Sequence, residues 1–218
     1  MRIIFLDVDG VLNNDETEDK IFGWVGIDSK LLNNLKELYD ESNKEEETRI
    51  VISSSWKYDE VRSRRQIETC GYTKVENCYA ELLKRLNDQN MEVLDFTREP
   101  ISQSKRGEGI LKWIEEYNEK HEPISTYVVL DDEEFDFEYH EDLYKRFIRT
   151  SRYYDEEEYY SEYYYSYIPE GLTKKYVEKA LKILRGEIGE EDVTESWLFN
   201  IVSSCHGDSV RYIYHDIG

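Results

Sequence analysis

Near-continuous apolar runs alternate with stretches of helical periodicity along most of the chain. The runs lie at Arg2–Leu6, Arg49–Ile52, Glu92–Phe96, Thr126–Leu130 and Phe147–Thr150. A short apolar run with few polar positions is typical of a strand that is buried on both faces. Because strands separated by helices join through right-handed crossovers, the pattern predicts an α/β fold with a Rossmann-like, doubly wound, mostly parallel sheet.

The stretches between these runs carry apolar residues at helical spacing. Asp28 and Ser29 form a typical helix cap, followed by leucines on one stripe from Leu31 to Leu38. Further helices are predicted over Tyr58–Cys70, Glu81–Asn87, Gly109–Tyr117 and Lys174–Arg185. We therefore expect one domain over residues 1–185 and a C-terminal extension over 186–218, whose role the sequence does not indicate.

The charge balance is strongly acidic, with 28 Lys and Arg against 49 Asp and Glu and a net charge of −21. Such a chain does not bind phosphate backbones through its overall field, although a local basic or metal-charged cleft can still accept an anion. No apolar run approaches the roughly 20 residues of a membrane span, and no signal peptide is evident, so no membrane association and a cytoplasmic location are expected. Three cysteines without C-x-x-C spacing predict neither disulfides nor a zinc site.

Three of the predicted strands end in small acidic or hydroxyl residues. Asp7 and Asp9 follow the first strand, Ser53–Ser55 follow the second, and Asp131–Asp132 follow the strand at 126–130. The carboxyl ends of parallel strands line one crevice, so we expect these side chains to meet there. Crowded carboxylates raise one another's pKa unless a cation neutralises them, and oxygen ligands suit Mg²⁺. The sequence therefore predicts a magnesium site.

The same segments resemble the motifs of the haloacid dehalogenase (HAD) superfamily. Asp7–Asn13 is similar to the first motif, Ile50–Ser53 to the second, and Asp131–Asp132 with Asp136 to the acidic fourth motif. All of them follow predicted strands in the order that the superfamily requires. The resemblance covers roughly residues 1–185 and implies a HAD-like fold.

The third motif supplies a cation at the start of a helix, and two neighbouring residues compete for it. Lys105 is the commoner residue type in the superfamily. Arg106 is favoured, because Arg106–Trp113 and Ser53–Lys57 resemble the HAD-like domains of RNA repair proteins of the polynucleotide kinase/phosphatase type.

The resemblance implies a phosphomonoester hydrolase that acts through an aspartyl-phosphate. Asp7 is the implied nucleophile, and Asp9 is the implied general acid and base. Ser53 and the amide of Ser54 are expected to hold phosphoryl oxygens, while Arg106 or Lys105 offsets negative charge. The implied Mg²⁺ ligands are Asp7, the carbonyl of Asp9 and Asp132, with Asp131 and Asp136 in support.

The segment Asn13–Gly26 has room for only one helical turn and a hairpin flap around Phe22–Val25, and no large cap is evident. An open site favours a large substrate such as a phosphorylated nucleic-acid end. The net charge speaks against such a substrate, and a nucleotide or another small phosphomonoester is the alternative. Arg62–Arg65 is either a helix face without a role or a basic rim for an extended substrate.

Residues 153–167 hold eight tyrosines interleaved with five acidic residues. The segment is a base-stacking platform, a protein-binding surface, or an acidic loop packed on its own domain. The last interpretation is the first choice. An alternative function follows from the second: an acidic, Tyr-rich binding or inhibitory protein on a HAD scaffold, with a protein partner at residues 153–167.

Overall fold

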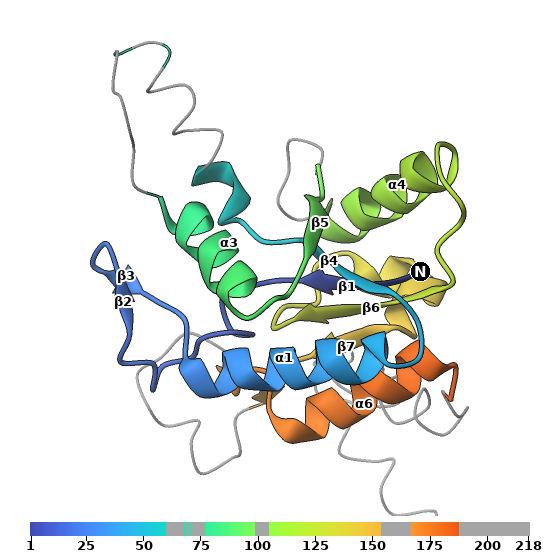
Figure 1. Ribbon diagram of the computed structural model, residues 1–218. Coiled ribbons are helices and arrows are strands. Elements are labelled where there is room, and N and C mark those ends of the chain that lie inside the picture. Colours follow the sequence, from blue (N-terminus) through green and yellow to red (C-terminus); the bar gives the residue numbers. More distant parts are fainter. Residues whose placement is uncertain (60–67, 69, 71–76, 99–104, 154–166, 188–218) are drawn as a thin grey trace, which may run out of the picture. The chain divides into compact units, whose positions relative to one another are not determined.

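A five-stranded parallel sheet forms the centre of the computed structural model, which describes residues 1–59, 68, 70, 77–98, 105–153 and 167–187 (Figure 1). The strand order is β5-β4-β1-β6-β7, and every neighbouring pair is parallel. This arrangement confirms the predicted α/β fold. The strands are β1 Arg2–Leu6, β4 Thr48–Ile52, β5 Val93–Phe96, β6 Thr126–Asp131 and β7 Phe147–Arg149.

The middle strand, β1, is buried on both faces, as its apolar run predicted. Ile3–Leu6 are fully inaccessible to solvent. Leu6, its last residue, lies opposite Ile52 in β4 and Leu130 in β6. Since these three strands are in register, the residues that follow them emerge along one edge of the sheet.

Helices cover both faces of the sheet: α1 and α6 pack together on one face, and α3 and α4 lie on the other (Figure 1). The predicted cap of α1 is confirmed, because the Asp28 carboxylate accepts hydrogen bonds from the amides of Lys30 and Leu31. The predicted helix at 58–70 lies largely outside the described residues. The helices are α1 Ser29–Asn43, α3 Cys78–Asp88, α4 Arg106–Asn118, α5 Glu141–Tyr144, α6 Lys174–Arg185 and the 3₁₀ turn η2 Phe137–Tyr139.

Aromatic packing fixes α4 against the sheet. Trp113 of α4 meets Phe5 of β1 edge to face, with 5.5 Å between the ring centroids. Ile110, Phe137 and Leu143 belong to the same buried cluster. This packing places the first residue of α4 near the carboxyl end of β1.

Two short hairpins stand outside the main sheet. The predicted flap is confirmed: β2 Lys20–Ile21 and β3 Trp24–Val25 pair antiparallel, and Trp24 is 74% exposed. The strands β8 Ser151–Tyr153 and β9 Tyr167–Pro169 pair at the two ends of the tyrosine-rich segment. Residues 154–166 of that segment lie outside the described residues.

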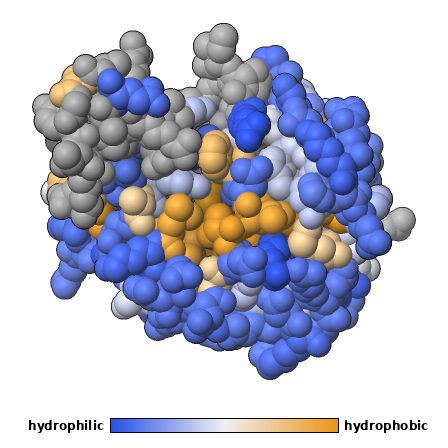
Figure 2. Space-filling model, turned by 45° about the horizontal axis from the view of Figure 1, so that its top comes forward, coloured by the Kyte–Doolittle hydropathy of each residue, from blue (hydrophilic) through white to orange (hydrophobic). Residues whose placement is uncertain are grey.

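The charged residues gather at the surface. Hydrophilic residues cover most of the face shown in Figure 2, on either side of a central apolar band. Among the described Asp and Glu residues, Asp7 and Asp131 are buried, and these two carboxylates need a separate explanation.

Candidate active site at the carboxyl edge of the sheet

The backbone ladder continues beyond the strands and fixes one row of polar residues. The amide of Asp7 donates to Leu130 O at 3.0 Å, and the amide of Ser53 donates to Leu6 O at 2.8 Å. Thr97 and Thr150 continue β5 and β7 in the same way. The chain thus places a carboxylate or hydroxyl at the end of every strand of the sheet, as the rule for open α/β sheets predicts.

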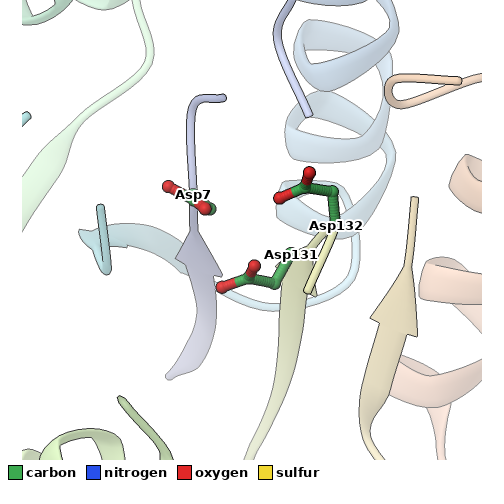
Figure 3. Close-up of side chains that lie close together, drawn as sticks. All are labelled: Asp7, Asp131 and Asp132. Atoms are coloured by element: carbon green, nitrogen blue, oxygen red, sulfur yellow. The ribbon is translucent and has the colours of Figure 1, made fainter. Parts of the chain in front are cut away.

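Three carboxylates from two of these strand ends form a cluster (Figure 3). Asp7, Asp131 and Asp132 each offer an oxygen atom, and these oxygens lie within 4.8 Å of one another. Asp131 is fully buried, and Asp7 is 4% exposed. Burial and then the negative charge of Asp7 raise the pKa of Asp132 to about 7 and that of Asp131 well above its ordinary range. Such a group of hard oxygen donors can hold a divalent cation.

Arg106, the first residue of α4, lies between two members of this cluster. Its Nη1 donates to Asp7 Oδ2 at 2.6 Å and to Asp131 Oδ2 at 2.5 Å. The guanidinium also stacks 4.1 Å from the centre of the Phe135 ring. Burial alone lowers the pKa of Arg106, but the charges of Asp131 and Asp7 outweigh it and raise that pKa. The arginine is therefore held as a permanent cation against the two carboxylates.

Lys105 occupies a different environment from that of its neighbour. Its side chain is 55% exposed, and Nζ donates to Glu108 on the surface of α4 at 2.8 Å. Lys105 precedes the helix and has a non-helical backbone, with φ −112° and ψ 44°, whereas Arg106 is the first helical residue. Of the two residues that compete for the third motif, the structure brings Arg106 to the carboxylates.

Asp136 holds the beginning of α4 instead of joining the carboxylate cluster. Its Oδ1 accepts from the amide of Gly107 at 2.6 Å, and its Oδ2 accepts from the amide of Glu108 at 3.0 Å. Both amides belong to the first turn of the helix, where backbone donors have no partner within the helix. Asp136 thereby fixes the helix terminus that carries Arg106.

Asp9 lies beside the cluster at the opening of the site and is exposed as a residue. Its two carboxylate oxygens accept from Asn13 Nδ2 at 3.0 Å and from Trp56 Nε1 at 2.9 Å. Desolvation of the carboxylate raises the pKa of Asp9, although both hydrogen bonds oppose the rise. Asn13 and Trp56 lie within the motif segments identified from the sequence, but no role was predicted for either residue.

Gly10 allows Asp132 to approach the first motif. It has a φ of 67°, and a Cβ atom there would overlap with the Asp132 carboxylate. Thr150 Oγ1 donates to Gly10 O at 2.8 Å, and Ser151 Oγ donates to Asp132 O at 2.7 Å. No role was predicted for these two hydroxyls, although Thr150 is the last residue of the predicted strand at 147–150 and Ser151 follows it.

The comparison with protein families agrees with this geometry. A family model described as the HAD domain in Swiss Army Knife RNA repair proteins matches residues 3–154. The chain belongs to this family. The matched range includes Asp7, Ser53, Arg106 and Asp131. No curated protein and no solved structure matches the chain.

Several sequence-based interpretations lie beyond what the structure of the HAD domain describes. The arginines at 62–65, the tyrosine-rich residues 154–166 and the tail from residue 188 fall outside the described residues. Cys205 and His206, which were assigned no zinc role, lie in that tail. Among the helices that the structure describes, none has the length and apolar character of a membrane span.

Proposed function

We propose that this HAD domain is a Mg²⁺-dependent phosphomonoester hydrolase that forms an aspartyl-phosphate on Asp7. The observation that carries the proposal is the buried contact of Arg106 with Asp7 and Asp131, beside Asp132. If all three carboxylates are to be ionised, one guanidinium leaves two negative charges uncompensated. A divalent cation supplies that charge, and an all-oxygen donor set suits Mg²⁺.

The metal ligands proposed are the carboxylates of Asp7, Asp131 and Asp132, together with the carbonyl of Asp9. Bound there, Mg²⁺ would polarise the phosphoryl group and offset the charge that develops on it. Asp136 acts in this proposal through α4, because both of its oxygens already bind helix amides. Lys105 remains outside the reaction centre.

Asp7 and Asp9 divide the chemistry between them. A carboxylate oxygen of Asp7 bonds to phosphorus as the ester P–O bond breaks, and Asp9 donates a proton to the leaving alkoxide. A water molecule then attacks the aspartyl-phosphate at phosphorus while Asp9 takes its proton, so phosphate leaves and Asp7 is regenerated. The raised pKa of Asp9 suits a group that must hold a proton at the start of this cycle.

The remaining residues bind and orient the phosphoryl group. Ser53 Oγ and the Ser54 amide donate hydrogen bonds to phosphoryl oxygens, and Arg106 holds Asp7 in place and offsets negative charge. We place phosphorylated nucleic-acid ends first among the substrates, because the family to which the domain belongs is that of RNA repair proteins. Nucleotides and small phosphomonoesters are the other candidates.

The test measures phosphate release from p-nitrophenyl phosphate and from a panel of phosphorylated oligonucleotides, nucleotides and sugar phosphates. We expect activity to require Mg²⁺ and to fall at least ~10³-fold in Asp7→Asn. Asp15→Asn is the matched control, since Asp15 is exposed and lies outside the cluster. Equal activity in Asp7→Asn and Asp15→Asn would contradict the proposed function.

A further inference from the structure

A buried lysine lies next to the proposed phosphate-binding serine. Lys57 is 3% exposed, and its Nζ donates to Thr97 Oγ1 at 3.0 Å. Thr97 is fully buried, and its hydroxyl donates in turn to Ser53 Oγ at 3.5 Å. Lys57, Thr97 and Ser53, from the segments that follow β4 and β5, therefore form one chain of hydrogen bonds that ends at Ser53.

The ammonium group of Lys57 sets which atom donates and which accepts in each of these hydrogen bonds. An ammonium group has three donors and no acceptor, whereas a hydroxyl can both donate and accept. Thr97 Oγ1 accepts from Lys57 and donates its own proton to Ser53 Oγ. Ser53 Oγ thus accepts the hydrogen bond from Thr97. Its own proton then points away from Thr97 and can be donated to another acceptor.

We propose that Lys57 and Thr97 are positioning residues that orient the Ser53 hydroxyl as a hydrogen-bond donor to the bound phosphoryl group. The inference rests on the role given to Ser53 in the proposed function. Without this orientation, Ser53 can turn its proton toward Thr97 and present lone pairs to an anion. Thr97 also gives the buried ammonium a hydrogen-bond acceptor, which a buried charge requires.

This relay is separate from the Arg106 contacts. Arg106 bonds directly to Asp7 and Asp131, on the side of the site formed by β1 and β6. Lys57 reaches Ser53 from the side of β4 and β5, through the Thr97 hydroxyl. The two cations thus serve different partners: the carboxylates for Arg106 and the phosphate-binding hydroxyl for Lys57.

The test compares Thr97→Val, which keeps the side-chain shape but removes the hydroxyl, with Thr97→Ser, which retains it. Binding of inorganic phosphate is measured by calorimetry with saturating Mg²⁺, and thermal unfolding checks that each variant is folded. We expect Thr97→Val to weaken phosphate binding about tenfold and Thr97→Ser to stay within about threefold of the original protein. Lys57→Met is expected to weaken binding in the same direction.

A double-mutant cycle isolates the action through Ser53. In a Ser53→Ala background, the further change Thr97→Val is expected to alter phosphate affinity less than about twofold. The inference is overturned if Thr97→Val binds phosphate as the original protein does, if its loss persists without the Ser53 hydroxyl, or if the original protein binds no phosphate. If binding follows the expected pattern but no substrate is hydrolysed, the relay stands and the proposed function fails.

Discussion

The α-carbon of Gly10 faces the Asp132 carboxylate so closely that no side chain fits between them. Gly10→Ala must therefore displace Asp132 and also strain a backbone with a φ of 67°. We expect it to lower the free energy of unfolding by about 1–3 kcal/mol and to weaken Mg²⁺ binding at least ~10-fold. Urea denaturation and Mg²⁺ titration measure the two effects.

Gly23→Ala is the matched control for that substitution. Gly23 has a φ of 89°, but a Cβ atom there meets no described atom within 4 Å. Both variants carry backbone strain, and only the one at position 10 collides with a proposed ligand. Similar Mg²⁺ affinities in the two variants would show that the approach of Asp132 to Gly10 is not needed for the metal.

Replacing Arg106 by methionine is expected to destabilise the metal-free protein by about 3–5 kcal/mol, because Asp7 and Asp131 would remain buried without their cation. Lys105→Met is expected to leave stability nearly unchanged, since Lys105 pairs with Glu108 in solvent. Urea denaturation in the presence of a chelator measures both. Equal losses would contradict the assignment of Arg106 as the buried cation.

The different positions of Arg106 and Lys105 show which part of the site can be predicted from the sequence and which cannot. The strand-end rule placed Asp7, Ser53 and Asp131 together, because register and edge position follow from apolar runs alone. The choice between two adjacent cations depends on the rotation of α4 about its axis. That rotation is set by the packing of Trp113 against Phe5 and by the Asp136 cap, which are contacts between distant segments.

The residues that sequence reasoning missed share a property. Asn13, Trp56 and Thr97 act on other site residues through side-chain hydrogen bonds across 4, 47 and 44 positions of the chain. Neither hydrophobic periodicity nor motif spacing predicts which side chains form these hydrogen bonds. Thr150 and Ser151 are different, because the strand-end rule applied to the last strand of the sheet would have selected them.

Asp136→Ala removes the acceptor for two amides of α4 and is expected to cost about 1–2 kcal/mol of stability. Because α4 carries Arg106, hydrolysis should also fall. Asp28→Ala is the matched control, since Asp28 caps α1 in the same way and that helix carries no proposed catalytic residue. We expect similar losses of stability and unequal losses of activity, measured by urea denaturation and initial rates. Equal activities would show that the cap does not position Arg106.

The decrease of stability with rising pH is expected to disappear when Mg²⁺ binds. The pKa of Asp132 is raised from 3.8 to about 7, so the folded protein keeps a proton that the unfolded chain has already released. The metal-free protein should therefore lose free energy of unfolding as the pH rises from about 5.5 to about 7.5. Mg²⁺ competes with that proton, so saturating metal should stabilise the protein more at the higher pH. Urea midpoints at both pH values, with chelator or with Mg²⁺, measure the pH dependence of the two states, and Asp132→Asn should reduce that of the metal-free protein. Greater stability of the metal-free protein at the higher pH would contradict the buried, proton-binding state of Asp132.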